Sequence, residues 1–113
     1  MRPADVRLPR PVVRAVVRGL VQPVMCEDRL PVTVRRRWLD VLAATSTRPL
    51  PGTRVTQTVL AGRPCEVVTG PGAAGGAAVL HLHGGGFTTG SPRVYRALAS
   101  HLSAAVGTPV HVL

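Results

Sequence analysis

The stretch "HLHGGGFTTGSP", residues 81–92, sets three consecutive glycines between an apolar run and a helix start. The run "AAVLHLH", residues 77–83, is continuous enough for a strand that is buried on both faces of a parallel sheet. Ser91 suits a helix N-cap, and Pro92 suits the first helical position. Glycine is unfavourable inside either neighbour, so the cluster predicts a loop that requires bare backbone.

The residues after this loop predict a helix and a further strand. Val94, Leu98, His101 and Leu102 form an apolar stripe at helical spacing, and Gly107 suits the helix C-cap. The run "PVHVL", residues 109–113, then predicts a strand, which we expect to be a central parallel one. The order strand, glycine loop, helix, strand predicts one βαβ unit.

The residues before the loop predict a hairpin preceded by helices. Residues 55–60 alternate in polarity and residues 64–69 follow after a turn sequence, Ala61-Gly62, which indicates an antiparallel pair of strands. Apolar spacing predicts helices over 11–22 and 31–44, and "RPLPGTR" then breaks the helical pattern. We therefore divide the chain into a helical, cap-like segment, 1–50, and an α/β segment, 51–113.

The first predicted helix is amphipathic and basic. Arg10, Arg14 and Arg18 recur every four residues beside a stripe of valines. Such a helix can lie on an anionic membrane surface or under a lid, or it can pack its valines and expose its arginines. Because no Trp or Phe is present to anchor it among lipid headgroups, we expect the packed arrangement.

The composition limits the choice of partner and compartment. The net charge is +9, but every one of the 14 cations is Arg and only 3% of residues are aromatic. Without lysines or a stacking platform, this bias does not favour nucleic-acid binding. No apolar run reaches the ~20 residues of a membrane span. Cys26 and Cys65 are far apart with no CxxC motif, which favours free thiols in the cytoplasm.

A glycine cluster in this position has three physical uses: binding a phosphate, donating N–H groups to an oxyanion, or permitting a tight turn. The phosphate use requires GxGxxG or GxxxxGK[ST], and the sequence contains neither pattern and no Lys. An oxyanion hole requires backbone donors with no side chains in the space of the substrate, which glycines satisfy. The oxyanion hole is favoured, and the tight turn stays the alternative.

The combination of "HLHGGGFTTGS" with "YRALASHLSAAVGTPVHVL" resembles the N-terminal part of the hormone-sensitive-lipase-like branch of the α/β-hydrolases. The resemblance implies a partial α/β-hydrolase fold with N-terminal helices, a β-hairpin, one βαβ unit and an incomplete sheet. It also implies that the backbone N–H groups of Gly85 and Gly86 form the oxyanion hole. His83 is then expected to brace the loop, Gly84 to permit its bend, and Phe87 to pack beside the acyl group of the substrate.

The predicted site contains no metal or cofactor. His81 and His83 share one face of the predicted strand, but a catalytic zinc site normally takes three protein ligands. No third ligand has suitable spacing, so we predict no metal at this position.

The catalytic triad of a serine hydrolase is not in this sequence. The serines, Ser46, Ser91, Ser100 and Ser103, do not lie in GxSxG, and every Asp precedes the glycine motif. We therefore expect the N-terminal part of a serine carboxylic-ester hydrolase, inactive alone, from an interrupted gene or an incomplete gene model. Its substrate would be a small-molecule ester or lactone, and its oligomeric state is left open. The alternative is a non-catalytic basic interaction module, and the sequence downstream would distinguish the two.

Overall fold

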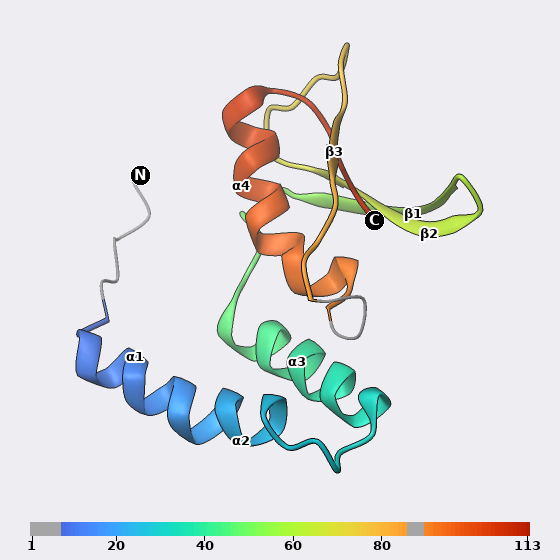
Figure 1. The fold of residues 1–113 in the computed structure, drawn as a ribbon. Helices are drawn as coiled ribbons and strands as arrows, with labels where there is room; N and C mark the ends of the chain where they lie inside the picture. The colour runs from blue at the N-terminus through green and yellow to red at the C-terminus, as the bar shows by residue number, and fades with distance from the viewer. Residues whose placement is uncertain (1–7, 86–89) are drawn as a thin grey trace. The chain divides into compact units, whose positions relative to one another are not determined.

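The protein is described from a computed structural model that covers residues 8–85 and 90–113 (Figure 1). The chain forms two compact units, Met1–Pro31 and Val32–Leu113. The second unit holds a four-stranded sheet together with helices, which confirms the predicted α/β class. The expected division of the chain into a cap-like segment, 1–50, and an α/β segment, 51–113, is a functional one and stays a prediction.

The first unit contains a single run of helix. It consists of α1 (Arg10–Val16), the π-helical segment η1 (Val17–Val21) and α2 (Gln22–Met25). The helix begins directly after Pro9, with a further proline in its first turn, where a missing N–H costs no hydrogen bond. The helix predicted over 11–22 is confirmed.

Within the described part of this unit, the valine stripe of the helix is not packed, and the expected packed arrangement stays a prediction. Five of its large apolar side chains are each between 42% and 45% exposed: Val12, Val13, Val16, Val17 and Leu20. The reason is that the described part of this unit holds no second element against which the stripe could be buried.

The second unit begins with α3 (Val32–Ser46), which confirms the helix predicted over 31–44. Its last turn is closed by hydroxyl groups, since Thr45 Oγ1 donates to the carbonyl of Val41 at 2.9 Å and Thr47 Oγ1 donates to that of Ala43 at 2.7 Å. These hydroxyls add a second donor to carbonyls that backbone groups already pair, since the N–H of Thr47 also donates to Ala43 at 2.9 Å.

The sheet has the order β1-β2-β4-β3. Its strands are β1 (Arg54–Leu60), β2 (Arg63–Thr69), β3 (Val79–His81) and β4 (Val110–Val112). Strands β1 and β2 form the predicted antiparallel hairpin, with Ala61 at φ 50° and Gly62 at φ 75° in a two-residue turn. Strand β2 is antiparallel to β4, and β4 is parallel to β3.

The chain passes from β3 to β4 through the glycine loop, a short 3-10 helix η2 (Pro92–Tyr95) and α4 (Arg96–Val106). Gly107 ends α4 in the left-handed conformation at φ 74°, as predicted. Strand β4 lies between β2 and β3, which confirms both the βαβ unit and the central place of β4.

The core lies between α4 and one face of the sheet. Val68, Val110 and Val112 are fully buried there against Ala99. The face of α4 that packs on the sheet consists mainly of small residues, and Leu102 also packs against the core. Leu98 is 55% exposed and His101 is exposed, so the predicted apolar stripe is wrong at these two positions.

Helix α4 has small residues on this face because its backbone lies very close to Gly70, at the end of β2. A Cβ at Gly70 would lie 2.5 Å from the carbonyl oxygen of Ser100. The backbone N–H of Gly70 donates to Ser103 Oγ at 2.9 Å, and this hydroxyl donates to the carbonyl of Thr108 at 2.7 Å. The Ser103 side chain thereby joins the end of β2 to the turn before β4.

The opposite face of β3 is open among the described residues. Leu80 is 54% exposed and Leu82, just after the strand, is 65% exposed. The expectation of a strand buried on both faces is therefore wrong for this part of the chain, and the strand is only three residues long. The reason is that α4 packs on one face only, that of Val110 and Val112.

The two cysteines differ in exposure, which gives a chemical prediction. Cys26 is exposed, whereas Cys65 is 2% exposed, and burial together with the charge of Glu66 raises the pKa of its thiol. An alkylating reagent reaches the Cys65 thiol only when the chain opens locally. An opening free energy of about 3 kcal/mol lowers the alkylation rate of Cys65 about 100-fold relative to that of Cys26. Mass spectrometry after timed alkylation at pH 8 measures both rates, and equal rates would contradict this packing.

The raised pKa of Cys65 also predicts how the free energy of unfolding changes with pH. The folded chain holds the thiol proton more tightly than the unfolded chain, whose thiol titrates near the ordinary value of 9.0. The stabilisation is therefore present below pH 9.0 and is lost as the pH rises above it. Cys65→Ala should flatten the alkaline fall of the urea midpoint, and Cys26→Ala is the matched control.

Candidate active site

The glycine loop starts at the carboxyl end of the parallel pair β3 and β4. His81 ends β3, and its carbonyl accepts a hydrogen bond from the N–H of Leu113 at 3.1 Å, so both strands end side by side. Ligands of α/β proteins bind at this edge of a sheet. The sequence thus places the motif where the fold offers room for a substrate.

The backbone of the loop requires glycine at Gly85. Its φ is 129°, in a region that side chains of L residues rarely adopt. Gly84, which was expected to permit the bend, has no positive φ, so the strained turn falls one residue later. Gly86 and Phe87 lie outside the described residues, and their predicted roles stay predictions.

The ring of His83 contacts both the loop and Tyr95. Its Nδ1 lies 2.9 Å from the carbonyl oxygen of Gly84, which is within hydrogen-bond distance, and the bracing role predicted for His83 stays a prediction. The ring stacks on Tyr95 with centroids 5.5 Å apart and planes 14° apart. His81 contacts the same Tyr95 ring, with centroids 5.2 Å apart. From the sequence, Tyr95 was assigned no role. It contacts both histidine rings because η2, which ends at Tyr95, folds back over the end of β3.

Gly90 closes the loop against its own beginning. Its φ is 93°, and a Cβ at this position would lie 2.9 Å from both the carbonyl oxygen of Gly84 and Nδ1 of His83. Only a residue without a side chain allows this approach. The two ends of the glycine loop are therefore packed against each other around the His83 ring.

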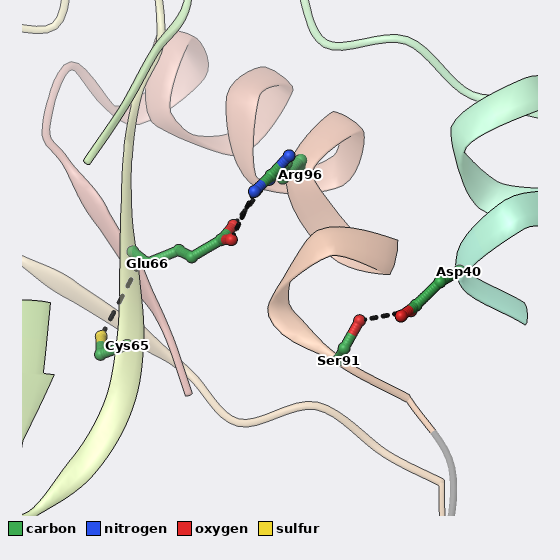
Figure 2. Close-up of polar contacts among 5 residues, drawn as sticks. All are labelled: Asp40, Cys65, Glu66, Ser91 and Arg96. Atoms are coloured by element: carbon green, nitrogen blue, oxygen red, sulfur yellow. Dashed lines mark hydrogen bonds and ion pairs between the residues drawn. The ribbon is translucent and has the colours of Figure 1, made fainter. Parts of the chain in front are cut away.

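Two polar contacts anchor the segment that follows the loop (Figure 2). Ser91 holds the predicted N-cap position, before η2, but its side chain makes no capping bond. Its Oγ instead donates to Asp40 Oδ1 of α3 at 2.6 Å. Arg96 donates to Glu66 of β2 twice, from Nε at 2.7 Å and from Nη2 at 2.5 Å. These bonds raise the pKa of Arg96 and tie the start of α4 to the sheet.

A cavity of about 660 Å³ opens beside the loop. Its lining includes Leu82, His83 and Gly90 from the loop region, Pro92 from η2, and Arg36 and Arg63. This volume is within the range of small-ligand sites. The cavity thus joins an apolar surface, the glycine backbone and two guanidinium groups.

The described residues contain neither a cluster of metal-binding side chains nor a membrane-spanning helix. No group of three or more His, Cys, Asp or Glu is arranged to hold a metal ion in residues 8–85 and 90–113. Within those ranges, no helix combines the length and the apolar character needed to cross a membrane.

Packing around Gly90 gives a stability prediction. Gly90→Ala should lower the free energy of unfolding by about 2 kcal/mol more than Gly72→Ala, because Gly72 has a similar φ of 77° but open space around it. Urea unfolding measures the difference, and NMR of the His83 ring protons reports whether the Tyr95 stack is lost. Equal costs with unchanged ring signals would show that Gly90 does not hold His83.

Comparison with known proteins gives relatives of a consistent kind. No family model matches the chain. It is 41% identical over 96 residues to the putative acetyl-hydrolase LipR of Mycobacterium tuberculosis, a match that covers 85% of this chain and 30% of LipR. A crystal structure of an esterase from the bacterial hormone-sensitive lipase family aligns with a TM-score of 0.75 and 26% identity, over 94% of this chain and 35% of that one. A hormone-sensitive lipase from a metagenome library aligns with a TM-score of 0.74 and 27% identity, over 94% and 34% of the two chains.

The sheet, the glycine loop at its carboxyl edge and these matches define part of an α/β-hydrolase fold. Within that fold, the chain is similar to part of the bacterial esterases of the hormone-sensitive-lipase family. It spans 30% of the length of LipR and 35% of the esterase structure.

Proposed function

We propose that this chain forms the oxyanion-hole part of a serine carboxylic-ester hydrolase that acts on a small ester or lactone. The observation that carries the proposal is the positive φ of Gly85 in a glycine loop at the carboxyl edge of the parallel strands. Such a loop can direct backbone N–H groups toward a bound carbonyl oxygen without a side chain in the way.

The chemistry assigned to the chain is electrostatic. When a serine attacks the ester carbonyl, the carbonyl oxygen becomes an oxyanion, and the N–H groups of Gly85 and Gly86 donate hydrogen bonds to it. Phe87 packs beside the acyl group. The nucleophile, acid and base come from residues outside these 113 positions, since the sequence contains no GxSxG.

The proposal extends to the organisation and compartment of the protein. Residues 1–50 serve as a cap-like helical segment and residues 51–113 as the first part of the hydrolase core. The contact between Asp40 of α3 and Ser91 beside the loop supports a link between the two segments. A cytoplasmic location is supported by the free thiols of Cys26 and Cys65.

A chimera with LipR tests the function. In this chimera, residues 1–113 replace the segment of LipR that matches them, and hydrolysis of p-nitrophenyl acetate is measured for the chimera and for intact LipR. We expect saturable hydrolysis by the chimera, abolished when the serine nucleophile contributed by LipR is changed to alanine. A folded chimera that lacks activity, beside an active LipR, would contradict the proposal.

A further inference from the structure

Tyr95 contacts both the core of the sheet and the start of the glycine loop. Its ring lies against those of His81 and His83, with centroids 5.2 Å and 5.5 Å away. It also packs against the buried core cluster, which consists of Val68, Ala99, Val110 and Val112. The ester chemistry above assigns no part to this side chain, although it joins the loop to the most rigid part of the fold.

The stack on Tyr95 orients the ring of His83. The two ring planes are 14° apart, which is the offset-stacked arrangement that aromatic pairs favour. Because a stacked pair loses contact area when one ring tilts, the stack restricts where the edge of the His83 ring can point. Gly90 restricts the same ring at its Nδ1 edge, since a Cβ on Gly90 would lie 2.9 Å from Nδ1 and 3.2 Å from Cε1.

The Nδ1 edge of His83 lies against a peptide group of the loop. Nδ1 is 2.9 Å from the carbonyl oxygen of Gly84, within hydrogen-bond distance. This carbonyl and the N–H of Gly85 belong to one planar peptide group. Among the described residues no peptide bond is cis, so the C=O and the N–H of this group point in opposite directions. The position of the Gly84 oxygen therefore sets the direction of the Gly85 N–H.

We propose that Tyr95 is a positioning residue of the oxyanion hole. Its ring holds the ring of His83 so that the Nδ1–H donates to the carbonyl of Gly84. The shared peptide group then directs the N–H of Gly85 toward the oxyanion. Tyr95 acts only through His83 and does not touch the substrate in this role. The inference rests on the proposed function, because it assumes that the Gly85 N–H serves as a donor to the oxyanion.

The first test is NMR of the ¹⁵N-labelled 113-residue chain at pH 8. The ring nitrogens of His83 distinguish the Nδ1–H tautomer from the Nε2–H tautomer, and the Gly85 amide reports on the peptide group. We expect the Nδ1–H tautomer in the wild-type chain and in Tyr95→Phe, because phenylalanine keeps the ring that makes both contacts. In Tyr95→Leu the ring should show a mixture of the two tautomers, and the Gly85 amide signal should move.

The second test is hydrolysis of p-nitrophenyl acetate by the LipR chimera. Tyr95→Leu should lower kcat about tenfold, which is roughly the most that one aromatic pair contributes. KM should change little, because the direction of an oxyanion donor matters in the transition state rather than in the bound ester. Tyr95→Phe should restore the wild-type kcat.

Leu102→Ala is the matched control for a general loss of packing. Leu102 contacts the same core cluster as Tyr95, but it lies further along α4 than the segment that meets the loop. Urea unfolding gives the stability of both variants, and the rates are measured at a temperature at which both are folded. Leu102→Ala should keep the wild-type kcat per folded molecule and the Nδ1–H tautomer of His83.

The outcomes separate this inference from the proposed function. An active chimera in which Tyr95→Leu keeps full kcat, or loses no more than Leu102→Ala, would overturn the positioning role and leave the ester hydrolase standing. A lower kcat with an unchanged tautomer would overturn the route through His83. The wild-type chain decides the matter even if Tyr95→Leu does not fold, because a predominant Nε2–H tautomer at His83 would contradict the inference. An inactive wild-type chimera would overturn both proposals.

Discussion

Gly85→Ala lowers kcat of the LipR chimera by about 100- to 1,000-fold, the cost of losing one donor of an oxyanion hole. The substitution keeps the backbone N–H but adds a methyl group to a residue whose φ of 129° suits glycine alone. The N–H is then moved from the position at which the charge develops. Initial rates of p-nitrophenyl acetate hydrolysis at several concentrations separate this loss from a change in KM.

The matched control for Gly85→Ala is Gly76→Ala. Gly76 also has a positive φ, 99°, and open space around it, but it lies in the loop before β3, away from the cavity. Both substitutions carry the same kind of backbone strain, so the urea midpoints should fall by similar amounts while only Gly85→Ala affects kcat. If both variants lose activity in proportion to lost folded protein, the glycine motif is only a turn.

Gly70→Ala has the largest expected effect on stability, a loss of about 3 kcal/mol in the free energy of unfolding. A Cβ at this position would lie 2.5 Å from the carbonyl oxygen of Ser100 and 2.8 Å from the amide nitrogen of Ala104. Both atoms belong to the backbone of α4, so the contact can be relieved only by moving the helix away from β2. That movement would also break the hydrogen bond from Gly70 N to Ser103 Oγ.

Gly19→Ala is the control of opposite sign. Gly19 lies within the first helix with nothing near its missing Cβ, so alanine there should be neutral or stabilising by up to about 1 kcal/mol. Urea unfolding followed by circular dichroism measures both variants. A Gly70→Ala chain as stable as the Gly19→Ala chain would show that α4 does not pack on β2 at this distance.

The topology was predictable because its signals are local. The two-residue turn at Ala61 and Gly62 fixes the hairpin, and Gly107 fixes the end of α4. The place of β4 between β2 and β3 was predicted from the family resemblance and the apolar run at 109–113. The hairpin and the end of α4 depend on backbone conformation within a short window, whereas the place of β4 in the sheet also required the resemblance.

The side-chain contacts that hold the glycine loop and the start of α4 in place could not be predicted, because they join residues far apart in the sequence. Asp40 and Ser91 are 51 positions apart, and Glu66 and Arg96 are 30 apart. The stack of Tyr95 on His83 likewise appears only when η2 folds back over the end of β3. Apolar periodicity placed Leu102 correctly against the core but also placed Leu98 there, which is 55% exposed, since the close approach of Gly70 requires small residues on the neighbouring part of the helix.

The most direct test of the oxyanion assignment is a crystal structure of the LipR chimera after reaction with a p-nitrophenyl phosphonate ester. The bound phosphonyl group is tetrahedral and places an oxygen where the oxyanion of the intermediate would lie. We predict that this oxygen lies about 2.7 to 3.1 Å from the backbone nitrogens of Gly85 and Gly86. A phosphonyl oxygen that is directed away from both nitrogens, with its hydrogen bonds supplied by other groups, would contradict the assignment.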